Sequence, residues 1–183
     1  MIHKSQLPTP ALLVDLEVLK YNIAYMARKT SQIGVNLRPH IKTHKSTKIA
    51  QMQIAAGAIG ITCAKISEAE VMAQTGVDDI FVAYPIVGDY QLGKAAALAR
   101  CCRLTLACDS LVAAQRMNYY AGTQGLKFRL SLIINTGGNR DGILPEQAVS
   151  LAEEIRHLPN LELRGVMTHE GHLHKCRDMV EVD

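Results

Sequence analysis

Residues 59–76, IGITCAKISEAEVMAQTG, contain a complete strand-then-helix unit. Ile59 to Cys63 form a short apolar run, which is typical of a buried strand. Ser67-Glu68-Ala69-Glu70 has the spacing of a capping box and predicts the start of a helix. Gly76 is well placed to end that helix. A strand followed directly by a helix is the building unit of parallel α/β proteins.

The same alternation extends along the whole chain. Strands are expected over 11–14, 35–42, 59–63, 80–84, 103–108, 128–134 and 161–168, and helices after Asp15, over 46–56, after Ser67, around Leu92 and Leu111, and over 145–155. Repeated βα units predict either a doubly wound sheet or a (β/α)₈ TIM barrel. No G-x-G-x-x-G or Walker A sequence follows a strand, and this favours the barrel.

The length of the chain indicates an incomplete barrel. A full (β/α)₈ barrel takes about 250 residues, whereas this chain has 183. Six barrel-type strands are expected from Val35 onward, so the prediction is one barrel domain over residues 1–183, truncated after about six strands, with two βα units missing.

Composition excludes several classes of protein. The net charge is +3, and the 20 Lys and Arg residues are scattered, so we expect no nucleic-acid partner. No apolar stretch approaches the roughly 18 residues of a membrane span, and residues 1–6 have no apolar signal core. The five cysteines show no C-x-x-C spacing, which indicates free thiols. We therefore expect a cytoplasmic protein that is not bound to a membrane.

Residues 37–45, LRPHIKTHK, concentrate cations and imidazoles where a strand is expected to end. Side chains alternate along a strand, so Arg38, His40 and Lys42 would all point into the barrel. Pro39 lacks an N–H, so a basic loop is an equally good interpretation. If Lys42 points inward, burial and cationic neighbours lower its pKa, as imine formation with an aldehyde requires.

Three segments, LPTPALLVD (7–15), RPHIKTHK (38–45) and AYPIVG (83–88), resemble the D-threonine aldolase and D-serine dehydratase group. These enzymes belong to the alanine racemase-like, fold-type III pyridoxal-phosphate enzymes, and the resemblance covers about residues 7–172. It implies that pyridoxal 5′-phosphate is bound covalently by Lys42, and not by Lys45. His40 becomes a candidate cofactor contact.

Two further segments follow strands. Asn135-Thr136-Gly137-Gly138-Asn139-Arg140-Asp141-Gly142 is typical of a Gly-rich turn, and the resemblance implies that Arg140 contacts the ring oxygen of the cofactor. Asn135, where many relatives have Asp, is given no role. Thr168-His169-Glu170-Gly171-His172 could hold zinc through its two histidines. The resemblance favours His169 and His172 as cofactor or substrate contacts instead, with no metal site.

Tyr84, at another expected strand end, is a further candidate cofactor contact, although it could equally be a packed rim tyrosine.

The resemblance implies a lyase acting on a small D-3-hydroxy amino acid. Retro-aldol cleavage to glycine and an aldehyde, as in D-threonine aldolase, is the favoured activity, and dehydration, as in D-serine dehydratase, is the alternative. An inactive fragment or a non-catalytic pyridoxal-phosphate protein is the alternative of another class. The C-terminal β domain is expected to be absent, so a divalent metal, Mn or Zn, is expected only in a full-length parent. A homodimer is expected.

Overall fold

A computed structural model describes residues 3–177; residues 1–2 and 178–183, which the expected domain over 1–183 includes, lie outside the described part. The strands are β1 (Ile61–Cys63), β2 (Asp79–Pro85), β3 (Arg103–Cys108), β4 (Phe128–Ile133) and β5 (Leu161–Met167). The α-helices are α1 (Leu16–Gln32), α2 (Thr47–Ala55), α3 (Ile66–Ala73), α4 (Asp89–Ala99), α5 (Leu111–Thr123) and α6 (Ala148–Arg156). The predicted alternation of strands and helices is confirmed from β1 onward.

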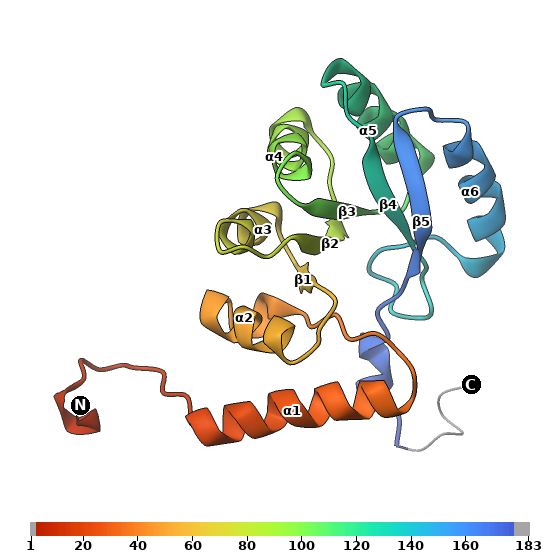
Figure 1. Cartoon of the computed structure of the whole chain (residues 1–183). Coiled ribbons are helices and arrows are strands. Elements are labelled where there is room, and N and C mark those ends of the chain that lie inside the picture. The colour runs from red at the N-terminus through yellow and green to blue at the C-terminus, as the bar shows by residue number, and fades with distance from the viewer. Residues whose placement is uncertain (1–2, 178–183) are drawn as a thin grey trace.

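The five strands form one parallel sheet in the order β1-β2-β3-β4-β5. Each strand therefore pairs with the next one in the chain, as in a barrel, and the order never reverses as it does in a doubly wound sheet. Helices α2 to α6 form an arc around the strands, and α1 lies beyond α2 (Figure 1). The α/β class is confirmed. In the described part the sheet is open, and it has five strands where six were expected.

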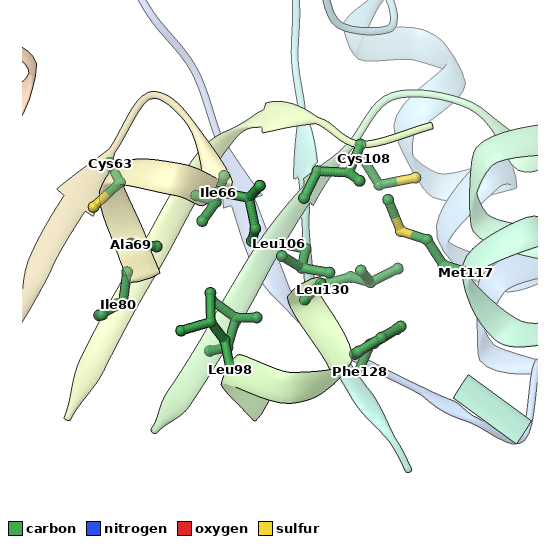
Figure 2. Packing of buried hydrophobic residues seen from close by; sticks show 14 of the residues in the cluster. Cys63, Ile66, Ala69, Ile80, Leu98, Leu106, Cys108, Met117, Phe128 and Leu130 are labelled. Carbon is green, nitrogen blue, oxygen red and sulfur yellow. The ribbon is translucent and has the colours of Figure 1, made fainter. Parts of the chain in front are cut away.

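The hydrophobic core lies between the sheet and the helices. Figure 2 shows Leu106 and Leu130 from neighbouring strands close to Leu98 of α4, with Met117 of α5 beside Cys108. Leu106, Leu130 and Met117 are fully buried. Burial of a side chain of this size contributes about 1.5–3 kcal/mol, so this interface fixes the strands and their carboxyl ends.

The helix expected after Asp15 is confirmed together with its cap, and the helix expected over 46–56 is observed as α2, one residue shorter at each end. The Asp15 carboxylate accepts hydrogen bonds from the backbone N–H groups of Glu17 and Val18, both at 3.0 Å. Ser46 caps α2 through its hydroxyl, which accepts from the N–H of Ile49. Such caps satisfy N–H groups that have no partner within the helix.

The strands expected over 11–14 and 35–42 are wrong. Residues 11–14 form no strand, and the second segment keeps a single parallel bridge, between His40 and Thr62. Pro39 can donate no ladder hydrogen bond, and the chain then turns into a short 3₁₀ helix over Ile41–Thr43. Lys42 therefore lies in a turn and is exposed. The other interpretation had placed it on a strand, with its side chain pointing into the barrel. Of the two interpretations of this segment, the basic loop is the better description.

Arg38 lies at the opposite end of the sheet from the expected site. Its Nη1 donates to the Asp79 carboxylate at 2.7 Å, and Asp79 is the first residue of β2. The Arg103 side chain reaches the other oxygen of that carboxylate at 3.0 Å. A β-carbon at Gly60 would come within 2.5 Å of the Asp79 carbonyl oxygen, so only glycine fits there. The Arg38–Asp79 ion pair therefore links the segment before His40 to the first residue of β2.

The capping box expected at Ser67 does not form. Helix α3 begins two residues earlier than that box implies, at Ile66, and its N-cap is Lys65. Ile66 is buried in the core, and its burial determines where the helix starts. The carboxylate that reaches back beyond the N-cap belongs to Glu68, which accepts from the N–H of Ala64 at 2.8 Å.

Candidate active site

The site is built around the turn from His40 to Lys45. Ile41 is fully buried and anchors the turn in the core. The His40 ring Nδ1 accepts a hydrogen bond from the N–H of Lys42 at 3.2 Å, and the N–H of Lys45 donates to the carbonyl of Ile41 at 2.8 Å. Lys45 adopts a left-handed backbone conformation with φ of 50°. These contacts fix the backbone from which the Lys42 side chain extends into solvent.

Among residues 3–177, no carboxylate lies within ion-pair distance of the Lys42 ammonium, whereas Lys45 pairs with Glu68 at 2.7 Å. The two lysines of the motif therefore have different surroundings. Lys45 is held against α3, and Lys42 has no acidic partner in the part of the chain that the structure describes.

His40 lies within electrostatic reach of His169, which follows the strand at the far edge of the sheet. Burial lowers the pKa of His40, and the Lys42 charge lowers it further; Glu68 acts in the opposite direction, and His169 adds to the lowering. His169 follows β5, whereas His40 precedes β1, so the two outer strands bring residues from distant parts of the chain within electrostatic reach. The structure thus brings together His40, Lys42 and His169.

The loop after β4 is organised by Asn135, to which the sequence assigned no role. Its side-chain oxygen accepts from the N–H groups of Gly137 and Asn139, at 3.0 and 3.1 Å. Its amide nitrogen donates to the side-chain oxygen of Asn139 at 2.9 Å. This is an Asx-type turn, which the Asn residue ahead of two glycines could have indicated. The turn fixes the backbone conformation just before Arg140, from which the Arg140 side chain extends.

Arg140 and His172 face a hollow of about 290 Å³ between this loop and the end of β5. The hollow is also lined by Asn135, Asp141 and His169. Arg140 is exposed, and its guanidinium lies 3.3 Å from the Asp141 carboxylate. The Nδ1 atom of His172 is buried and has no hydrogen-bond partner within residues 3–177. A buried polar atom without a partner is unusual in a folded protein and marks His172 as a candidate ligand contact.

The two loops that form the hollow are also joined directly. The hydroxyl groups of Thr136 and Thr168 are hydrogen-bonded at 2.6 Å. Gly137 has φ of 116°, and a β-carbon there would lie 2.9 Å from His172 Nε2. The glycine therefore allows the ring of His172 to lie against the loop.

Tyr84 lies elsewhere. It is 61% exposed and lines a separate hollow of about 880 Å³ between α3 and α4, together with Lys65 and Tyr90. The structure does not bring it to the hollow that contains Arg140 and His172. The assignment of Tyr84 as a cofactor contact stays a prediction.

In residues 3–177, no three His, Cys, Asp or Glu side chains are grouped so that they could hold a metal ion. None of the helices within this range is long and apolar enough to cross a membrane.

Comparisons with known proteins agree with this architecture. Residues 14–181 match the family model described as alanine racemase, N-terminal domain. The chain is 39% identical over 168 residues to a D-threo-3-hydroxyaspartate dehydratase from Delftia sp. (strain HT23), covering 90% of this chain and 44% of that protein. It is 29% identical over 178 residues to a D-threonine aldolase from Arthrobacter sp., covering 97% and 47%.

A solved structure shares the fold closely. The crystal structure of D-threonine aldolase from Filomicrobium marinum superimposes with a TM-score of 0.91 at 34% identity, over 96% of this chain and 48% of that one. The chain thus spans about half the length of the relatives that it matches.

Proposed function

Since the chain belongs to the alanine racemase N-terminal domain family, we propose that it forms the cofactor-binding part of a pyridoxal-phosphate-dependent lyase acting on D-3-hydroxy amino acids. The observation that carries the proposal is the Lys42 side chain, which lies beside the carboxyl edge of the sheet without an acidic partner in residues 3–177. His40 and His169 lie within electrostatic reach of each other at this edge.

The residues present fit pyridoxal phosphate. Lys42 would hold the aldehyde carbon covalently through its amine, because no carboxylate of residues 3–177 pairs with that nitrogen. Arg140 presents a planar set of donors to an anionic ring oxygen, and the buried Nδ1 of His172 lacks a partner in the structure. When bound, the cofactor supplies an electron sink for charge released at the substrate Cα.

The protein's own residues would position the reacting groups. The His40 imidazole is favoured in its neutral form because its pKa is lowered by burial and then by the Lys42 charge. In the neutral form its Nδ1 lone pair can accept the hydrogen bond from the Lys42 N–H, so His40 would position the turn that carries Lys42. His169 and His172 extend from the loop after β5 and would contact cofactor or substrate.

We propose retro-aldol cleavage, as in D-threonine aldolase, as the reaction. The alternative is dehydration, which is supported by the 39% identity to the Delftia D-threo-3-hydroxyaspartate dehydratase. Released aldehyde and glycine would indicate cleavage, and a 2-oxo acid with ammonia would indicate dehydration. The Mn or Zn requirement of a full-length parent, the homodimer and the cytoplasmic location stay predictions.

The test is chemical labelling of the chain. It is incubated with pyridoxal 5′-phosphate and reduced with borohydride, and the pyridoxylated peptide is identified by mass spectrometry. Label should be found on Lys42 and be lost in Lys42→Arg. Exposed Lys48 provides a matched control, since Lys48→Arg should leave the labelling unchanged. Label found on Lys45 or Lys65 and absent from Lys42 would overturn the proposal.

A further inference from the structure

The Glu68 carboxylate joins two parts of the chain that are distant in sequence. One oxygen accepts from the Lys45 ammonium at 2.7 Å, and the other accepts from the N–H of Ala64 at 2.8 Å. The Glu68 side chain is only 9% exposed. A buried carboxylate with both oxygens bonded holds its partners strongly, because leaving it unpaired would be costly.

Both partners bear on the site. Lys45 ends the turn that carries Lys42, and Ala64 follows β1 directly. Burial alone would raise the pKa of Glu68, but the hydrogen bonds from Lys45 and from the Ala64 N–H outweigh it, and the pKa is lowered overall. The ionised Glu68 carboxylate therefore holds the Lys45 ammonium in an ion pair against α3.

The chemistry of cofactor attachment makes this pair significant. The lysine nitrogen uses its lone pair to form a bond to the aldehyde carbon, and the carbonyl oxygen leaves as water after gaining two protons. No electron donor or acceptor is needed. A lysine held in an ion pair must leave its carboxylate partner before its nitrogen can reach the aldehyde, so the ion pair disfavours its reaction.

We propose that Glu68 is a positioning residue that selects between the two lysines of the turn, by holding Lys45 against α3 and leaving Lys42 as the reactive amine. This inference rests on the proposed function, in which Lys42 carries the cofactor. Two lysines three residues apart on one turn would otherwise compete for the same aldehyde, and a shift of the covalent bond to Lys45 would displace the cofactor from Arg140.

The same helix supplies a matched control. Glu70 of α3 also pairs with a lysine, Lys94 of α4, at 2.6 Å. Its side chain is 32% exposed, and neither partner belongs to the turn that carries Lys42. Glu70→Gln therefore removes an ion pair from α3 without changing the surroundings of Lys45.

The experiment compares Glu68→Gln and Glu70→Gln with the unchanged chain, using pyridoxal 5′-phosphate, borohydride reduction and quantitative peptide mapping. Glu68→Gln should raise the share of label on Lys45 by up to roughly fivefold, the factor expected for a half-exposed ion pair. The double variant Glu68→Gln/Lys45→Arg should return the label to Lys42. Circular dichroism checks that each variant is folded. If Glu68→Gln is not folded, Glu68→Asp replaces it in the comparison, because it keeps the charge on a side chain that is shorter.

The outcomes separate the two proposals. An unchanged Lys45 share in the folded Glu68 variant, or an equal rise in Glu70→Gln, overturns the role of Glu68. Absence of label from Lys42 in the unchanged chain overturns the proposed function itself, whatever happens at Lys45.

Discussion

Replacing Asp79 by Asn should weaken the fold by releasing the segment that leads into the site. The Asp79 carboxylate is 13% exposed and receives Arg38 Nη1 at 2.7 Å. The segment that Arg38 belongs to is tied to the sheet by two backbone hydrogen bonds, from the N–H of Ile59 to Leu37 and from that of Thr62 to Pro39. His40 and Lys42 follow directly.

The size of the effect follows from the exposure of each pair. A hydrogen bond to a charged group contributes about 1.5–3 kcal/mol when shielded from solvent. The Arg103 pair is 55% exposed on the arginine side, and a pair of that kind adds at most about 1 kcal/mol. Asparagine retains one acceptor oxygen, so we expect Asp79→Asn to lower the free energy of unfolding by about 2 kcal/mol.

The assay is urea unfolding followed by circular dichroism. With a slope of about 2 kcal/mol per M, the midpoint should fall by about 1 M. Amide exchange at Thr62 should also become faster, because its acceptor at Pro39 is less firmly held. Asp78→Asn is the control, since Asp78 is exposed and forms no side-chain ion pair within residues 3–177. A midpoint for Asp79→Asn equal to that of the control would refute the reasoning.

Two more predictions concern the loops and pH. Gly137→Ala should lower the unfolding temperature by a few degrees, because the φ of Gly137 is 116° and the new β-carbon would lie 2.9 Å from His172 Nε2. Gly138→Ala should leave the unfolding temperature unchanged, because its new β-carbon would meet no atom closer than 3.5 Å. Calorimetry of both variants tests this difference. Burial and, after it, the charge of Lys42 lower the pKa of His40 in the folded chain. The unfolded chain therefore binds the His40 proton more tightly than the folded chain does. As a result, the free energy of unfolding should fall as the pH drops below about 6.5. His40→Gln should reduce this fall in urea unfolding at a series of pH values, and an equal fall in both chains would speak against it.

The parts of the fold that the sequence predicts correctly are those determined locally. Arg103 to Cys108 was expected as a strand and is β3, since its apolar residues meet a core on one face. The expected Asp15 cap depends on a side chain and backbone groups two or three residues away. Such contacts form whatever the rest of the chain does.

The errors come from competition between local signals and tertiary contacts. Ser67 has the right spacing for a cap, but burial of Ile66 starts the helix earlier. The segment before Lys42 has alternating polar residues, which is typical of a strand. However, Pro39 has no N–H to donate, and the His40 side chain accepts a hydrogen bond from the N–H of Lys42, which forms a turn. The bond between Glu68 and Lys45 joins residues 23 positions apart, so no local pattern could have predicted it.

The way in which the site residues come together depends on strand order more than on any single motif. All strands run in one direction, so the segments that follow them lie along one edge of the sheet, and sequential pairing carries that edge from β1 to β5. His40 and His169 are held at opposite ends of this series, yet the charge of His169 still contributes to lowering the pKa of His40. A flat sheet of five strands, with neighbours about 4.8 Å apart, would separate its outer strands by roughly 19 Å, where screening in water would weaken such an influence. The strands lie inside the arc of helices (Figure 1), and this arrangement brings the strand ends closer together than a flat sheet would.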